Sequence, residues 1–238
     1  MPIVTTDSKH YTDIASAIRE KTNTAEKIPP CDMAGKVADV YDAGYVAGQS
    51  AGGGDDSTWD QYCKKTLVHA VIPEGVNSID AYMFYSHKNL QTITAKSKIN
   101  SISTYSFRDC SNLQHGEWYE NLASIGAYSF MNCISFKVDH TPSTCSSLGI
   151  SAFSGCTALE EMTIRAKTKS VLQNAFQNCT GLTKVTFEDK PTALNGQAFS
   201  GCTNLLTINV PWAEGEVANA PWGAPNVQQI NYNYTQEG

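Results

Sequence analysis

Cysteine and histidine are the residues of this chain that carry the most reactive side chains. The sequence holds eight cysteines and five histidines, and such residues can bind metals, form disulfides or act as nucleophiles. Five of the cysteines fall at a 23-residue step: Cys110, Cys133, Cys156, Cys179 and Cys202. A residue type fixed at one place of a repeat is typical of a core position, where free Cys packs as a small hydrophobe. We therefore predict reduced, buried thiols. A bridge between neighbouring coils stays the alternative, because stacking brings the thiols close together.

Sequence patterns that signal catalysis are missing. The chain contains no Gly-x-Ser-x-Gly, no His-Glu-x-x-His and no paired-carboxylate motif, so we predict no catalytic residue, no cofactor and no enzyme. A Cys-x-x-Cys pair, which would favour zinc, does not occur either. His87 takes the cysteine place in the first repeat and is predicted to be a core residue. We predict no metal, and a site made by His115, Glu117 and His140 is the alternative.

The cysteines belong to a repeat whose most regular member is phenylalanine. Six phenylalanines recur every 23 residues: Phe84, Phe107, Phe130, Phe153, Phe176 and Phe199. In each unit an alternating stretch such as 184–187 predicts a short strand with one face inward. Phe, Cys and Leu then lie on the return path, where the residue pair between Phe and Cys predicts the end of a short helical turn. One unit cannot bury its Phe alone, so the repeat predicts stacked coils.

One run of this repeat carries a resemblance to a known family. Residues 175–187 read Ala-Phe-x-x-Cys-x-x-Leu-x-x-Val-x-Phe, and this pattern resembles the BspA-type leucine-rich repeats, which are also associated with treponemal surface antigens. The resemblance covers about residues 67–211. It implies an α+β repeat solenoid, a right-handed leucine-rich-repeat stack of six 23-residue units, to which the sequence adds a helical N-terminal module. Such repeats serve adhesion, partner binding and virion structure, so this fold does not by itself imply one function.

The outward side chains of the predicted strands form the natural binding surface. The second, fourth and sixth places after the repeat Leu should point outward, namely Thr92, Thr94, Lys96, His115, Glu117, Tyr119, Val138, His140, Pro142, Glu161, Thr163, Arg165, Lys184, Thr186, Glu188, Thr207, Asn209 and Pro211. Gly116 and Asp139 occupy places that should be apolar, so we expect a register shift or a bulge there. The candidate ligand-binding residues are His115, Glu117, Trp118, Tyr119, His140, Glu161, Arg165 and Lys184. Polar groups with exposed aromatics would suit a glycan or protein ligand, and ordinary solvated variation is the alternative.

The two ends of the chain differ from the repeats. Residues 11–21 and 32–50 predict two helices, followed by glycines at 52–54. The candidate oligomerisation residues on these helices are Ile14, Ile18, Val37, Tyr41, Gly44 and Gly48. The predicted domains are a helical attachment or oligomerisation module at 1–51, a linker and N-terminal cap at 52–66, the solenoid at 67–211 and a C-terminal cap at 212–238. Strands at 67–72 and 227–234 should begin and end the stack. Trp212 and Trp222 should cover the last coil, with sugar stacking as their alternative role.

Both ends carry a second resemblance. Segments 13–22, 27–33 and 41–45, together with 210–223, are similar to tail-associated proteins of phages and prophages of Gram-positive gut bacteria. The resemblance implies a virion protein associated with the tail or baseplate. Its N-terminal helices would bind other virion proteins and form a homo-oligomer, and its solenoid would bind a host surface glycan or protein. The alternative is a secreted or surface-exposed bacterial adhesin of the same repeat class.

Net charge and hydropathy limit the classes of partner and the locations that we expect for the protein. The net charge is −6, with 17 basic against 23 acidic residues, which argues against a nucleic-acid ligand. No run of about 18 apolar residues occurs, so we predict no membrane insertion. No secretory signal is visible at the N-terminus. We therefore expect a virion protein made in the host cytoplasm and released by lysis, with an extracellular or cell-surface location as the alternative.

Overall fold

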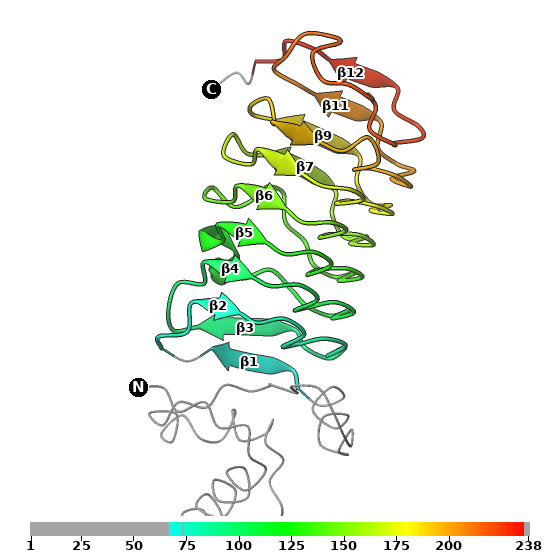
Figure 1. Cartoon of the computed structure of the whole chain (residues 1–238). Coiled ribbons are helices and arrows are strands. Elements are labelled where there is room, and N and C mark those ends of the chain that lie inside the picture. The colour runs from blue at the N-terminus through cyan, green and yellow to red at the C-terminus, as the bar shows by residue number, and fades with distance from the viewer. Residues whose placement is uncertain (1–66, 73, 236–238) are drawn as a thin grey trace, which may run out of the picture.

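Stacked coils of the chain build an elongated solenoid (Figure 1). The structure is a computed structural model, and it describes residues 67–72 and 74–235. The predicted helical module at 1–51, with its six candidate oligomerisation residues Ile14, Ile18, Val37, Tyr41, Gly44 and Gly48, lies outside the described residues. The predicted linker and N-terminal cap at 52–66 lie outside them too.

The longer strands form one side of the solenoid. Strand β1 (His69–Ile72) pairs in parallel with β3 (Thr92–Ala95). Farther along the stack, β7 (Glu161–Ile164), β9 (Lys184–Phe187), β11 (Thr207–Asn209) and β12 (Gln229–Asn231) form a second parallel sheet. Glu161 lies opposite Lys184, and Lys184 lies opposite Thr207. Each repeat therefore aligns with the next at the 23-residue step that the sequence predicts, and the predicted first and last strands, β1 and β12, are confirmed.

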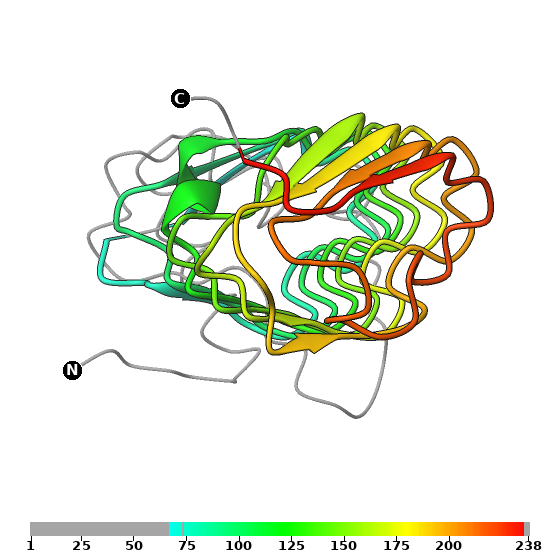
Figure 2. The same cartoon turned by 90° about the horizontal axis from the view of Figure 1, so that it is seen from above.

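A third sheet, made of two-residue strands, runs along the opposite side (Figure 2). Its strands begin at the apolar start of each repeat: β2 (Ser78–Ile79), β4 (Ser101–Ile102), β5 (Ser124–Ile125), β6 (Ser147–Leu148), β8 (Ser170–Val171) and β10 (Ala193–Leu194). All six pair in parallel in one sheet. This sheet is continuous from the first coil to the last regular one, whereas the sheet of longer strands is interrupted.

The return path of each coil is a series of turns. Among the described residues the only helix is the 3₁₀ helix η2 (Glu117–Asn121), so the α part of the predicted α+β class is wrong for this portion of the chain. The reason lies between Phe and Cys, where one residue per coil adopts a left-handed φ: Ser86, Asp109, Asn132, Gly155, Asn178 and Gly201. A left-handed residue ends a helical turn, so each turn stops before an α-helix can form.

The core is a stack of phenylalanine rings along the solenoid axis. Neighbouring rings, such as those of Phe153 and Phe176, have centroids 5.4 Å apart and planes within 7°. The five periodic cysteines are fully buried as free thiols, which confirms the predicted core role. His87, 7 % exposed, fills the same place in the first repeat, as predicted. Aromatic stacking with spacings of this kind adds to the hydrophobic gain from burial.

Two tryptophans close the C-terminal end of the core. Trp222 is fully buried and Trp212 is 4 % exposed. The Trp212 ring lies 5.2 Å from the Phe187 ring, and the two tryptophan rings lie 6.2 Å apart. Their predicted capping role is therefore confirmed. The alternative role in sugar stacking is wrong, since neither ring face is open to a ligand.

Candidate functional site

The sheet of longer strands breaks in the second and third repeats, where the sequence predicts an irregularity. A regular repeat directs two apolar side chains inward from its strand, as Met162 and Ile164 do. In the second repeat the first of these places is Gly116, which has no side chain to fill the core. The chain there forms η2 instead of a strand, and Trp118 and Tyr119 on η2 both enter the core.

This packing overturns part of the predicted binding face. Tyr119 is fully buried and Trp118 is 5 % exposed, so the prediction that these two aromatics contact a ligand is wrong. Trp118 lies beside the phenylalanine stack, with its ring 5.5 Å from that of Phe107. Alternation along a strand would have placed Tyr119 outward, but a 3₁₀ helix turns two adjacent side chains toward the same core.

The third repeat departs from the alternating strand pattern in the expected place. Val138 and Pro142 were predicted to point outward but are buried, whereas Asp139 is exposed. A single isolated β-bridge, between His140 and Thr163, pairs this coil with β7. The pairing therefore keeps the 23-residue register, and the expected register shift is wrong. The reversed exposure of Val138 and Asp139 fits the other expectation, a local bulge. Its consequence is that His140 lies at the edge of the interrupted sheet, facing η2.

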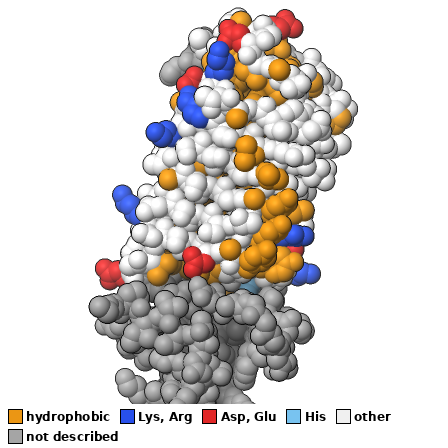
Figure 3. All heavy atoms as spheres, viewed as in Figure 1, with side chains coloured by type: hydrophobic (Ala, Val, Ile, Leu, Met, Phe, Trp, Pro, Cys, Tyr) orange, Lys and Arg blue, Asp and Glu red, His pale blue; other side chains and the backbone are white. Residues whose placement is uncertain are grey.

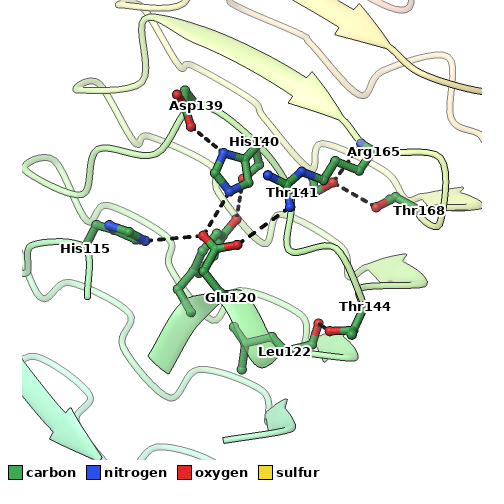
Figure 4. Close-up of polar contacts among 10 residues, drawn as sticks. His115, Glu120, Leu122, Asp139, His140, Thr141, Thr144, Arg165 and Thr168 are labelled. Atoms are coloured by element: carbon green, nitrogen blue, oxygen red, sulfur yellow. Dashed lines mark hydrogen bonds and ion pairs between the residues drawn. The ribbon is translucent and has the colours of Figure 1, made fainter. Parts of the chain in front are cut away.

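Glu120, at the exposed side of η2, joins the cluster of polar side chains formed there (Figure 4). Its Oε1 lies 2.9 Å from His140 Nε2 and 3.7 Å from His115 Nε2. Its Oε2 lies 3.7 Å from an Arg165 guanidinium nitrogen. On its other side, His140 Nδ1 lies 2.5 Å from Asp139 Oδ1. We call His115, Glu120, Asp139, His140 and Arg165 the Glu120 cluster.

Glu120 was missed by the sequence analysis. If the second repeat formed a strand, alternation would place Glu117 on the outward face and would give Glu120 no predicted role. In the structure Glu117 is exposed at the start of η2, and its side chain makes no hydrogen bond or ion pair with any described residue. The sequence did signal an irregular site here, because Gly116 and Asp139 stand at places that are apolar in the regular repeats.

Hydrogen bonds made by buried hydroxyl groups fix the backbone that carries the Glu120 cluster. The hydroxyl of Tyr119 donates a hydrogen bond to the backbone oxygen of His140 across 3.1 Å. Burial raises the pKa of this hydroxyl well above its ordinary value, so it stays a donor. The backbone N–H of Arg165 donates to Thr141 Oγ1 across 2.9 Å, and Thr141 in turn contacts the hydroxyl of Thr168. The cluster therefore rests on ordered backbone rather than on a free loop.

Two shallow hollows adjoin the cluster, with volumes of about 430 Å³ and 260 Å³. Charged and imidazole side chains dominate their combined lining, which comprises His115, Lys137, Val138, Asp139, His140, Glu160, Glu161, Thr163, Arg165 and Glu188. Lys137 pairs with Glu160, and Lys184 pairs with Glu161, each across 2.6 Å. Of the predicted ligand-binding residues, His115, His140, Glu161 and Arg165 therefore line one surface, and Lys184 reaches it through an ion pair.

The arrangement offers hydrogen-bond donors and acceptors rather than a reactive group. Within residues 67–72 and 74–235, no group of three His, Cys, Asp or Glu side chains is placed to hold a metal ion. The alternative metal site of His115, Glu117 and His140 is thus not formed, because Glu117 lies outside the cluster. In the same part of the chain, no helix has the length and apolar character needed to cross a membrane.

Comparisons with known proteins agree with this architecture. The family model for the BspA type leucine rich repeat region matches in six copies, over residues 60–146 and 123–218. A leucine-rich repeat protein from Bacteroides ovatus is 26 % identical, with a TM-score of 0.52 over 60 % of this chain and 39 % of its own. A leucine-rich repeat protein of T. pallidum is 23 % identical (TM-score 0.51, 68 % of this chain and 79 % of its own).

A third solved structure shares the fold alone. The pneumococcal vaccine antigen PcpA is 16 % identical, with a TM-score of 0.58 over 71 % of this chain and 42 % of its own. The chain thus spans about two fifths of the length of the Bacteroides and pneumococcal proteins. No curated protein aligns significantly with the chain.

Proposed function

Because the chain belongs to the family of proteins with BspA type leucine-rich repeats, we propose that it is a non-enzymatic binding module. Its Glu120 cluster recognises a neutral glycan on a cell surface. The observation that carries this proposal is the interruption of the sheet at η2. Stacking alone favours identical coils. A departure in two coils that gathers four ionisable side chains around Glu120 therefore supports a functional role for this surface.

The chemistry of the cluster fits hydroxyl groups. A sugar hydroxyl donates one hydrogen bond and accepts others, and the cluster presents carboxylate acceptors next to the donors of His140 and Arg165. Hydrogen bonds to charged groups are about twice as strong as those between neutral groups. Recognition would rest on these polar groups alone, since Trp118 and Tyr119 lie in the core.

The balance of charge selects the kind of glycan. The hollows are lined by the carboxylates of Asp139, Glu160, Glu161 and Glu188, against the cations Lys137 and Arg165. This excess of negative charge disfavours sialylated or sulfated glycans through like-charge repulsion. A neutral glycan avoids that cost.

A glycan array probed with the full chain tests the proposal. We expect binding to a subset of neutral glycans, loss of binding for Glu120→Gln and His140→Ala, and unchanged binding for Thr94→Ala. Thr94 is the matched control because it is exposed on β3, outside the Glu120 cluster. A wild-type chain that binds no glycan or only anionic ones, or a Glu120→Gln variant that binds like the wild type, would overturn the proposal.

We propose two settings in which the module could work. A phage virion, with the module on the tail or baseplate and its N-terminal part bound to other virion proteins, is our first proposal, and a bacterial surface adhesin is the second. The virion proposal is supported by the resemblance of segment 210–223, and of the segments within 13–45, to phage tail-associated proteins. Peptide mass spectrometry of particles purified by density, compared with washed cells, distinguishes them: enrichment on cells and absence from particles would contradict a virion role.

A further inference from the structure

The imidazole ring of His140 lies between two carboxylates (Figure 4). Its Nδ1 lies 2.5 Å from Asp139 Oδ1, and its Nε2 lies 2.9 Å from Glu120 Oε1. Both distances lie within the range of a hydrogen bond. Each ring nitrogen therefore faces an oxygen that, in an ionised carboxylate, can only accept a hydrogen bond.

Two such contacts require two protons on the ring. A neutral imidazole has one nitrogen that donates and one that accepts, whereas the charged ring donates from both. The arrangement of Asp139, His140 and Glu120 is therefore complete only when His140 is charged. When the ring gives up a proton, a nitrogen lone pair faces a carboxylate oxygen, and one of the two contacts breaks. Histidine is the side chain that ordinarily changes charge between about pH 5 and 8.

The ring nitrogens contact the two carboxylates and no other side chain of residues 67–72 and 74–235. Ionisable side chains from four coils nevertheless surround His140, namely His115, Tyr119 and Glu120 on the second, Lys137 and Asp139 on the third, Glu160, Glu161 and Arg165 on the fourth, and Glu188 on the fifth. Lys137 and Glu160 pair with each other. A proton on His140 therefore acts first on the contacts with Asp139 and Glu120.

Asp139 is the partner that the neutral ring releases. Its side chain is 82 % exposed and contacts no other side chain in the described part of the chain. Glu120 is 38 % exposed, and Arg165 and His115 both approach it at 3.7 Å. Moving into water therefore costs Asp139 less than it would cost Glu120. The neutral ring keeps its proton on Nε2, toward Glu120.

We propose that protonation of His140 is a switch that holds Asp139 in the binding site. Asp139 lines both hollows, so its position decides where a ligand hydroxyl meets a carboxylate acceptor. A charged His140 holds this carboxylate, and a neutral His140 releases it into solvent. A group that is already held in its binding position loses less freedom when the ligand arrives. The site therefore binds a neutral glycan more tightly when His140 is charged. This consequence rests on the proposed function, whereas the release of Asp139 does not.

The switch acts on hydrogen bonds because the hydrophobic surface lies elsewhere. On the face drawn in Figure 3, hydrophobic side chains of the lower coils gather toward the edge that carries the turns, and η2 lies at the other edge (Figures 1 and 3). Among the residues that line the two hollows, Val138 is the one apolar residue. A neutral ligand here is held through donors and acceptors, which a change in protonation alters directly.

Nuclear magnetic resonance of the full chain without ligand tests the switch itself. Between about pH 8 and pH 5.5, the signal of the Asp139 side-chain carboxyl carbon should shift together with the His140 ring. The carboxyl of Glu117, which is exposed and outside the Glu120 cluster, is the internal control and should not follow. In His140→Gln, whose side chain stays neutral, the Asp139 signal should stay constant. An Asp139 signal that ignores His140 in the wild type, or still shifts in the variant, would overturn the proposal.

Binding of the full chain to an array of neutral glycans, in a concentration series at both pH values, tests the effect on the site. The wild type should bind about 2- to 10-fold more tightly at the acidic pH, the effect of one hydrogen bond. Asp139→Asn should bind equally at both, because an amide can donate to the neutral ring and accept from the charged one.

The matched control is His69→Gln, which removes an imidazole outside the Glu120 cluster, where His69 Nδ1 lies 2.6 Å from Thr92 Oγ1. It should keep the wild-type pH dependence. The proposal is overturned if Asp139→Asn keeps that dependence, or if His115→Gln abolishes it. A wild type that binds no glycan at either pH, while its Asp139 signal still follows His140, would contradict the proposed function and support the switch.

Discussion

The thiol of Cys179 donates a hydrogen bond to the backbone oxygen of Phe153, one coil earlier, across 3.1 Å. The same bond recurs in every coil that has a periodic cysteine, with Sγ to oxygen distances between 2.9 Å and 3.1 Å. The thiol thus fills the core and adds a second donor to the Phe153 carbonyl, which also accepts a hydrogen bond from the backbone N–H of Cys156. This double role explains why cysteine, rather than another small apolar residue, stands at this place.

Removing one ring from the phenylalanine stack should strongly destabilise the solenoid. Phe153 is fully buried and its ring contacts the rings of both neighbouring coils. We expect Phe153→Ala to lower the free energy of unfolding by about 3–5 kcal/mol, measured by urea denaturation. Phe153→Leu should cost clearly less, because it leaves a smaller cavity. Equal losses for the two variants would contradict the role of the stack.

Alkaline pH should destabilise the fold through the buried thiols. Burial raises the pKa of Cys133 and Cys179 well above the ordinary value, and it raises the pKa of Cys145 to about 11. An unfolded thiol loses its proton near pH 8.5, whereas the native thiol keeps it. The stabilisation is therefore complete below about pH 8.5 and is lost as the pH rises above it.

Urea denaturation between pH 7.5 and 10 measures this effect. The free energy of unfolding should fall steadily above about pH 8.5, and Cys179→Ala should reduce the slope, although it lowers stability at every pH. A slope that is unchanged in this variant would show that other groups cause the pH dependence.

Close approach of neighbouring coils requires glycine at position 149. A Cβ there would lie 2.6 Å from the backbone C of Gly126 and from the backbone N of Ala127. We expect Gly149→Ala to cost about 1–3 kcal/mol, as overpacking does, measured as a lower thermal midpoint. The exposed substitution Gln173→Ala is the control and should change the midpoint little. An unaffected Gly149→Ala variant would show that the coils can move apart freely.

The hydroxyl of Tyr119 should matter for stability and for the position of His140. In Tyr119→Phe the backbone oxygen of His140 loses its donor, at a cost of about 1–3 kcal/mol. Thermal unfolding measures the loss, and Tyr232→Phe, at a half-buried position on the C-terminal cap, is the comparison. If both variants unfold at the wild-type temperature, the hydroxyl does not support the cluster.

Most of the fold was predictable because the 23-residue step fixes it. Phe153, Cys156 and Leu159 recur in type and place, so periodicity alone assigns them to the core. The absence of an α-helix on the return path was not predictable in the same way, since it depends on left-handed residues as different as Ser86 and Asn178.

The candidate site was predictable in position but not in detail. Gly116 and Asp139 mark the irregular repeats in the sequence. Which side chains then point outward depends on how η2 packs, because Trp118 and Tyr119 both turn inward and fill the space that Gly116 leaves. Glu120 becomes central only through that packing.

Glu120 should contribute little to stability, so its loss can be read as a loss of function. Its side chain is 38 % exposed, and ion pairs at such positions contribute about 0–1 kcal/mol. We expect Glu120→Gln to unfold within about 1 kcal/mol of the wild type in urea. A larger loss would mean that the cluster serves the fold instead.

Titration calorimetry with the best neutral glycan from the array tests the Glu120 cluster most directly. The wild type and Thr94→Ala should bind with the same affinity. Glu120→Gln should bind about 10- to 100-fold more weakly, the effect of losing a hydrogen bond to a charged group. Equal affinity of Glu120→Gln and the wild type would contradict the assignment of the binding site to this cluster.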